Sequence, residues 1–111
     1  MALIKSGTAA LLLTLLAAGA PTGAVALDDP AAQRGMLFVR ANCARCHAID
    51  KVSPSPLAAA PPFRTLHQRY PIDSLAEAMA EGIVTGHPAM PEFRLDPGQI
   101  TDVLAFLRTL Q

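Results

Sequence analysis

The feature that most constrains how this chain can fold is the pentapeptide Cys43-Ala44-Arg45-Cys46-His47. Thiols three positions apart lie on one side of a helical turn, so both sulfurs can reach the vinyl groups of a single porphyrin. A histidine directly after the second thiol completes the spacing that attaches a c-type haem. The sequence contains 2 cysteines in all, so no other thiol competes for this role. The pattern therefore predicts covalent haem attachment through Cys43 and Cys46, with His47 as an iron ligand.

Two other uses of paired cysteines fit the sequence less well. A structural zinc site needs two further ligands at finger spacing, and the remaining histidines, His67 and His87, are too far apart to supply them. A thioredoxin-like dithiol usually accompanies a βαβ unit. No stretch rich in Val, Ile and Thr is present to form its strands. Haem attachment remains the favoured interpretation.

Residues 1–26 have the pattern of an export signal. Lys5 supplies a positive start, an apolar run follows from Ala9 to Ala18, and Ala24-Val25-Ala26 fits a small-x-small cleavage site. Glycine and proline interrupt the apolar run before it reaches the roughly 20 residues that a membrane span needs. We expect a mature domain of residues 27–111 in the periplasm, without a membrane span. An uncleaved leader that serves as an anchor is the less favoured alternative.

The composition sets limits on core and partners. The chain has 4 Phe, 1 Tyr and no Trp, so its own side chains provide little material for a core. A haem would add a large apolar body for the helices to surround, as small scaffolds usually require. The 9 Lys and Arg balance the 9 Asp and Glu, which excludes the basic field of a nucleic-acid-binding protein. The same balance predicts weak long-range steering of partners.

Two segments carry strong signals for the start of a helix. Asp29-Pro30 combines an acidic cap with proline at the first helical position, and this helix should end near Asn42. Asp96-Pro97-Gly98-Gln99 has capping-box spacing with the same proline placement. Asp102 is expected in the opening turn of this last helix. Apolar residues then recur at helical spacing: Ile100, Val103, Leu104, Leu107 and Leu110, with Phe106 widening the face.

A shorter helix is predicted from Ser74 to Glu81. Ser74 and Glu77 have capping-box spacing, with Asp73 as the alternative cap, and Gly82 should end the helix. Its apolar face was expected to consist of Leu75, Ala76, Met79 and Ala80. Between the first two helices, residues 51–62 are rich in proline and should form a loop around one edge of the porphyrin. With three main helices and no strands, the fold class is all-α.

Met90 stands on a segment that proline keeps out of helix, because Pro88 and Pro91 flank it. A thioether on a stiff loop, late in a haem-binding chain, is a candidate for the second axial ligand. His87 is the main alternative, and would make the haem bis-histidine; His67 is a weaker one.

Taken together, these features resemble the small bacterial class I cytochromes c over essentially the whole mature chain. The resemblance is carried by C-x-x-C-H after a glycine-bearing helix, by G-H-P-x-M-P, and by the final I-T-D-V-L-A-F-L-R-T-L. It implies the cytochrome c fold, in which three main helices and loops wrap one covalently attached haem c. It also implies His47 and Met90 as the axial ligands.

The same resemblance implies two further contacts. The first and last helices of that family cross through a glycine and an aromatic residue, which match Gly35 and Phe106. The aromatic residue usual four positions before the first cysteine is replaced by Val39. The carbonyl of a proline after the haem motif accepts the N–H of the proximal imidazole. Pro61 is the best match, with Pro62 next to it as the alternative.

The expected function is that of a periplasmic electron carrier rather than an enzyme. Its partners would be a periplasmic dehydrogenase as donor and an oxidase or reductase as acceptor, or it would be the haem subunit of such an enzyme. The alternative is a haem enzyme or gas sensor with an open or displaceable sixth iron site, in which His87 would be the acid-base group. Arg64 and Tyr70 are candidates for contact with the haem propionates.

Overall fold

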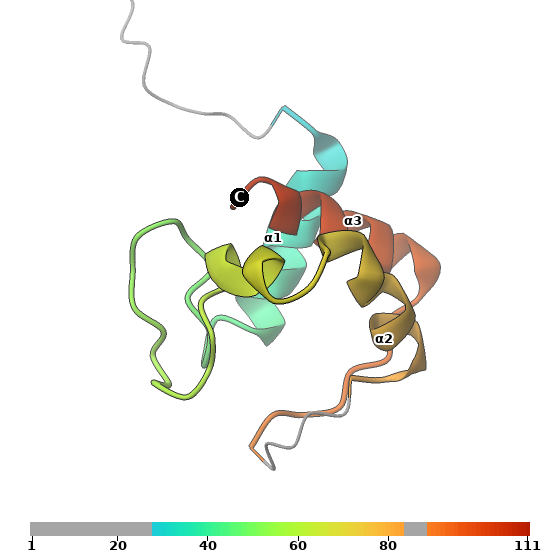
Figure 1. Cartoon of the computed structure of the whole chain (residues 1–111). Helices are drawn as coiled ribbons and strands as arrows, with labels where there is room; N and C mark the ends of the chain where they lie inside the picture. Colours follow the sequence, from blue (N-terminus) through green and yellow to red (C-terminus); the bar gives the residue numbers. More distant parts are fainter. Residues whose placement is uncertain (1–27, 84–88) are drawn as a thin grey trace, which may run out of the picture.

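The computed structural model describes residues 28–83 and 89–111. The expected export signal, residues 1–26, and His87 lie outside this part of the chain. The described residues form α1 (Pro30–Asn42), two 3₁₀ helices, η1 (Phe63–Gln68) and η2 (Ile72–Ser74), then α2 (Leu75–Glu81) and α3 (Pro97–Arg108) (Figure 1). They include no strand, so the all-α prediction is confirmed. None of the helices in the described ranges is both long and apolar enough to cross a membrane.

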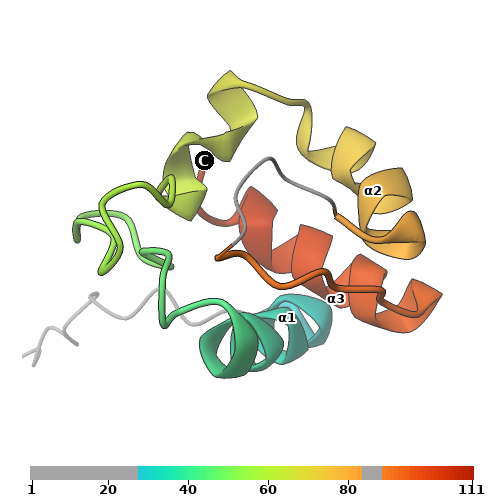
Figure 2. The ribbon, with the colours of Figure 1, turned by 90° about the horizontal axis from the view of Figure 1, so that it is seen from below.

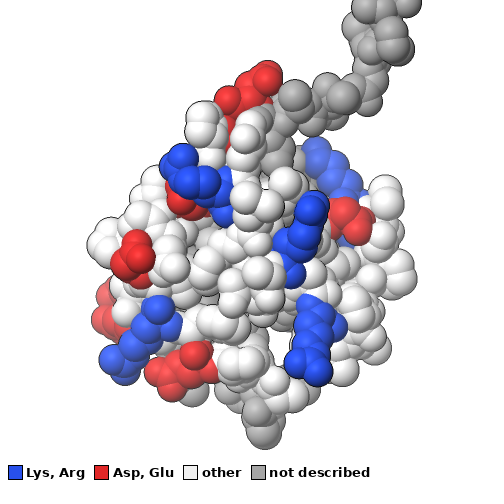
Figure 3. Space-filling model, turned by 180° about the vertical axis from the view of Figure 1, so that it is seen from behind, with Lys and Arg blue, Asp and Glu red and all other residues white. Residues whose placement is uncertain are grey.

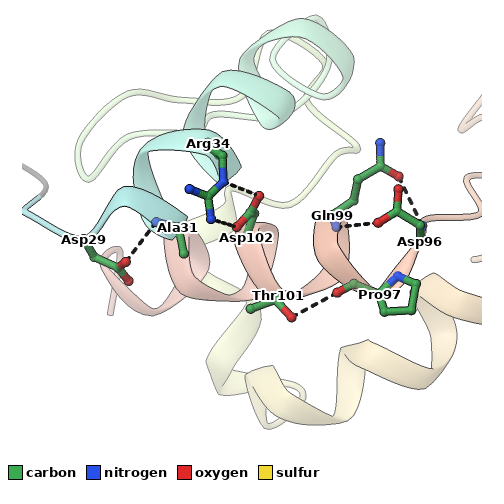
Figure 4. A network of polar contacts seen from close by, with 8 residues as sticks. All are labelled: Asp29, Ala31, Arg34, Asp96, Pro97, Gln99, Thr101 and Asp102. Atoms are coloured by element: carbon green, nitrogen blue, oxygen red, sulfur yellow. Dashed lines mark hydrogen bonds and ion pairs between the residues drawn. The ribbon is translucent and has the colours of Figure 1, made fainter.

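The two long helices begin where their capping residues predicted. The Asp29 carboxylate accepts a hydrogen bond from the Ala31 backbone N–H at 2.9 Å, and Pro30 occupies the first turn of α1. At α3 the capping box is complete, because the Gln99 N–H donates to Asp96 at 2.9 Å and the Asp96 N–H donates to Gln99 Oε1 at 3.1 Å (Figure 4). Each cap satisfies backbone donors that a helix start leaves free.

α1 and α3 form the most extensive helix pair in the fold and lie side by side (Figure 2). Their close approach depends on Gly35, which is buried at the crossing. A Cβ atom at this position would collide with the backbone carbonyl of Asp102 and would lie 3.0 Å from Cβ of Phe106. The predicted crossing through Gly35 and Phe106 is therefore confirmed. Val39, which stands in place of the usual aromatic residue four positions before the first cysteine, lies in the core and is fully buried.

A bidentate ion pair joins α1 and α3 beside the same crossing (Figure 4). Arg34 donates from Nε to Oδ2 of Asp102 and from Nη2 to Oδ1, both at 2.8 Å. The guanidinium holds the pKa of the Asp102 carboxyl below its ordinary value. The prediction that Asp102 lies in the opening turn of α3 was wrong, since that turn contains no acidic residue. Asp102 stands further along the helix, where it can reach α1.

The start of α2 differs from the prediction. Ser74 has φ −69° and ψ −14° and makes no side-chain capping bond, because it already belongs to the 3₁₀ turn η2. A capping side chain works from an extended residue, so the Ser74–Glu77 spacing was misleading. Asp73 is not a cap either; its carboxylate accepts a hydrogen bond from Arg108. The predicted end of the helix is confirmed, because Gly82 adopts φ +106°.

α2 contributes one buried side chain, Met79, to the core. Ala80, predicted on the apolar face, is exposed. Backbone bonds join the end of α2 to the chain that leads into α3: Leu95 N–H donates to the Met79 carbonyl at 2.9 Å and Ile83 N–H to the Phe93 carbonyl at 3.4 Å. These bonds hold together the two ends of the segment that carries Met90.

Candidate haem site

The helices and loops surround a cavity of about 380 Å³ with a predominantly apolar lining. The lining comes from the end of α1, the turn that follows it, the proline-rich loop, η1, α2, residues 89–95 and α3. Cys43, Cys46, His47 and Met90 all line this cavity. The structure thus brings together four residues that the sequence places in two segments far apart.

Helical geometry places the two thiols and the imidazole at the cavity wall. α1 ends at Asn42, and the N–H of the next residue, Cys43, donates to the Val39 carbonyl at 2.8 Å. The chain then makes one tight turn, in which the N–H groups of Cys46 and His47 donate to the Cys43 carbonyl at 3.1 and 3.0 Å. The two cysteines do not form a disulfide with each other. In the chain without haem, burial raises the pKa of the Cys43 thiol to about 11.

The His47 ring is oriented by a single backbone oxygen. Its Nδ1 lies 2.8 Å from the carbonyl oxygen of Pro61. Because a carbonyl can only accept, Nδ1 carries the proton and Nε2 keeps its lone pair free for a metal. The Phe63 ring packs against the imidazole with centroids 4.7 Å apart. The neighbouring Pro62 carbonyl accepts from Thr65 N and Oγ1 instead, at 3.0 and 2.8 Å.

Met90 is half-buried on the irregular segment before α3. Its side chain lines the same cavity as His47, as two facing axial ligands require. His67, the weaker alternative, is exposed on η1 and does not line the cavity. His87 lies outside the described residues. Within the described part, two thioethers line the cavity, that of Met79 on α2 and that of Met90 on the irregular segment.

The polar rim of the cavity differs from what the sequence suggested. Arg64 turns away and donates from Nη1 to the carbonyl of Ser53 at 2.7 Å, so it ties the proline-rich loop to η1. Tyr70 does line the cavity and is 53% exposed. Arg69 lines it as well and was missed by the sequence analysis.

These residues fit a covalently bound haem. Two thiols on one turn can form thioethers, an imidazole and a thioether can ligate iron, and the apolar lining matches the porphyrin faces. Across residues 28–83 and 89–111, no group of three or more His, Cys, Asp or Glu residues is arranged to hold a metal ion, so the zinc alternative has no support there. The class of protein that this fold and site define is a small helical haem protein.

Comparison with protein families names the class more closely. The sequence model of the Cytochrome c family matches residues 32–111, which include every site residue described above. The chain therefore belongs to the cytochrome c family, has its all-α fold, carries one covalently attached haem c and acts in haem-based electron transfer. No curated protein and no solved structure gives a significant match to the chain.

Proposed function

We propose that this cytochrome is a one-electron carrier of the periplasm whose iron is held by His47 on one side and Met90 on the other. The observation that supports this assignment is that both side chains line the cavity that also holds the two thiols. Nitrogen and thioether sulfur on opposite sides raise the reduction potential above that of a bis-histidine haem. The protein would then accept electrons readily.

The chain's residues prepare the site for electron transfer. When bound, the haem supplies an iron centre that gains and loses one electron. Cys43 and Cys46 hold the group in place, and the Pro61 carbonyl makes His47 a better donor by accepting a hydrogen bond from its Nδ1–H. The apolar walls exclude water. With both axial positions filled by side chains, no position remains for a substrate.

The compartment and the partners follow from the leader and from the filled coordination sphere. Residues 1–26 resemble a cleaved export signal, which supports a periplasmic location for residues 27–111. A carrier there receives electrons from a dehydrogenase and passes them to an oxidase or reductase. If the protein is instead the haem subunit of such an enzyme, it uses the same haem site.

Optical spectroscopy of the purified holoprotein tests this proposal. We expect a low-spin spectrum in both oxidation states, no rapid change when carbon monoxide is added to the reduced protein, and a one-electron potentiometric titration. A high-spin ferric spectrum with ready ligand binding would instead establish the haem enzyme or gas sensor with an open sixth site. The mass of the secreted chain, lowered by the loss of residues 1–26 and raised by one haem, checks the export signal separately.

A further inference from the structure

The proline-rich loop, residues 51–62, supplies the carbonyl that orients His47 but contributes little to the core. Within this fully described loop, Ala60 is the one buried residue, and Val52 is 84% exposed. A segment with so little buried apolar surface opens more easily than the packed helices do. The position of the loop, and with it the position of the Pro61 carbonyl, therefore depends on hydrogen bonds to the rest of the chain.

Hydrogen bonds close the loop where it meets η1. The Phe63 N–H donates to the Ala48 carbonyl at 2.9 Å, and Arg64 donates from Nη1 to the Ser53 carbonyl at 2.7 Å. We call these two contacts the loop closure. Pro61 shortly precedes both donors in the chain, so the loop closure restricts where its carbonyl can lie.

The acceptor of the Arg64 hydrogen bond is itself held in place. The N–H groups of Ser53 and Val52 donate to the Asp50 carboxylate at 2.6 and 2.7 Å. These bonds hold the pKa of Asp50 below its ordinary value, so the carboxylate that shapes this turn is charged at neutral pH. The turn thus fixes the residue whose carbonyl faces the guanidinium.

Arg64 binds backbone rather than an acid or the cavity. Besides the Ser53 carbonyl, its Nη1 reaches the Asp50 carbonyl at 3.4 Å. The ion pairs among described residues leave Arg64 out, and it is not among the residues that line the cavity, whereas Arg69 is. A hydrogen bond from a charged guanidinium to a carbonyl is stronger than one between neutral groups. This single side chain therefore holds an otherwise weakly packed loop against η1.

We propose that Arg64 is a positioning residue for the iron ligand His47, because the loop closure that it makes keeps the Pro61 carbonyl within hydrogen-bond distance of Nδ1–H. The inference rests on the proposed function, in which His47 binds the iron. Arg64 touches neither the imidazole nor the cavity and acts through the loop alone.

The hydrogen bond at Nδ1 affects the redox equilibrium. An imidazole that donates strongly from Nδ1–H is more electron-rich at Nε2, and it favours the more highly charged ferric iron over the ferrous iron. Loss of the loop closure should weaken this bond and shift the equilibrium toward the ferrous state. Arg64 would thereby influence the reduction potential from outside the cavity.

The variant Arg64→Met tests the inference in the holoprotein, because it keeps an aliphatic stem and removes the donor. We expect solvent exchange of the His47 Nδ1 proton to become faster by about fivefold or more, the factor that corresponds to one ordinary hydrogen bond. NMR of the reduced protein with isotope-labelled histidine measures this exchange. Arg64→Lys, which keeps a charged donor, should restore exchange toward the wild-type rate.

The matched control is Lys51→Met, which removes one positive charge from an exposed position at the start of the same loop. The basic groups on the face seen in Figure 3 are separated by uncharged surface, so the loss of one charge should alter the field around the molecule only locally. Loss of positive charge by itself favours the ferric state. In a potentiometric titration, Arg64→Met should therefore have a higher reduction potential than Lys51→Met, with wild-type exchange of the Nδ1 proton in the control.

Two results would overturn the inference. One is wild-type exchange in Arg64→Met together with a potential equal to that of Lys51→Met. The other is a lower melting temperature with both quantities unchanged, which would show that Arg64 only stabilises the loop. If Arg64→Met does not accumulate, Arg64→Gln decides in its place, because its shorter side chain should give faster exchange than the wild type, and an unchanged rate would contradict the inference. A wild-type holoprotein that is high-spin would defeat the proposed function, and the inference with it, before any variant is compared.

Discussion

At the scale of single residues, iron binding in this cytochrome depends on the orientation of the His47 imidazole. The Pro61 carbonyl, 2.8 Å from Nδ1, determines the tautomer of His47 and leaves Nε2 as the metal-binding atom. A backbone oxygen is suited to this task because it cannot be protonated near neutral pH. Phe63 restricts the ring further from one face. The imidazole is thus oriented by the fold before any metal binds it.

Replacement of Met90 by Leu should remove the second axial ligand and keep the side-chain volume. We expect a ferric form that is high-spin or has water bound, rapid binding of carbon monoxide after reduction, and a potential lower by on the order of 0.1 V. Absorption spectra and a potentiometric titration measure these changes. The control is Met79→Leu, which changes a methionine in the wall of the same cavity and should leave the spectrum low-spin.

An unchanged spectrum and potential in Met90→Leu would contradict the assignment of Met90. In that case His87→Ala identifies the ligand, because it should then produce the open form. If both methionine variants lost the low-spin spectrum to the same extent, the effect would reflect damage to the cavity rather than loss of a ligand.

The residues nearest to the cysteines could be predicted because their positions follow from one helical turn. The residues at the rim of the cavity could not be predicted in this way. Arg64 and Arg69 belong to or adjoin the same short helix, η1, and nothing in their local sequence distinguishes the one that binds the Ser53 carbonyl from the one that lines the cavity. That difference depends on where the proline-rich loop runs, which is a property of the tertiary structure.

At the scale of the helices, local capping chemistry decided which predictions succeeded. Asp29 and Asp96 are extended residues directly before proline, and both cap as predicted. Ser74 has an equally good sequence signal, but a 3₁₀ turn precedes it and gives it helical dihedral angles. A capping pattern is therefore informative where the preceding chain is extended, and it fails where another turn leads directly into the helix.

The α1–α3 crossing should not tolerate a methyl group at Gly35. In Gly35→Ala the new Cβ meets a backbone carbonyl, which cannot rotate away as a side chain can, so the helices must separate. We expect a loss of about 3 kcal/mol in the free energy of unfolding, or failure to accumulate. Denaturant titration of the holoprotein measures the change.

A second glycine in the same helix pair provides the control. In Gly98→Ala the new Cβ would lie 3.2 Å from Oδ1 of Asp96, a side-chain atom at the exposed start of α3. Its effect on stability should stay within about 1 kcal/mol, the range of helix propensities. Similar losses in both variants would mean that the crossing is looser than the structure describes.

The Arg34–Asp102 ion pair should make stability depend on pH at the acid end. The pKa of the Asp102 carboxyl is lower in the folded state than in the unfolded state. The ion pair therefore stabilises the fold fully above the unfolded pKa of about 4. The stabilisation is lost as the pH falls from there through the folded pKa. Asp102→Asn should therefore be less stable than the wild type at pH 7, with a difference that shrinks at lower pH.

Urea titrations of both proteins at several pH values between 7 and 3 measure that difference directly. Asp73→Asn serves as the control, because it removes a carboxylate that pairs with Arg108 at the exposed surface and takes no part in the crossing of α1 and α3. A gap between wild type and Asp102→Asn that stayed constant down to pH 3 would show that the carboxylate charge is not what stabilises the crossing.

At the scale of the whole molecule, the packed core lies to one side of the cavity. The largest fully buried side chains are Leu107 and Val39, both at the contact between α1 and α3. η1, α2 and the proline-rich loop line the rest of a cavity of about 380 Å³, and α2 also contacts α3. This arrangement explains why composition alone predicted a weak core and why the cysteine motif was needed to predict the fold.

The same arrangement makes haem attachment a requirement for folding. At ~24 cal/mol per Å³, an empty apolar space of that volume would cost about 9 kcal/mol, comparable with the entire stability of a typical domain. We expect Cys43→Ala/Cys46→Ala, which cannot be tethered to haem, to lack a cooperative thermal transition and to lose most of its helical circular dichroism. Wild-type holoprotein and the single variant Cys43→Ala, which keeps one possible thioether, are the controls. Because α1 and α3 retain their own caps and contacts, any residual protection from hydrogen exchange should be confined to those two helices. A cysteine-free chain that melted cooperatively at the wild-type temperature would show that the helices close the cavity unaided.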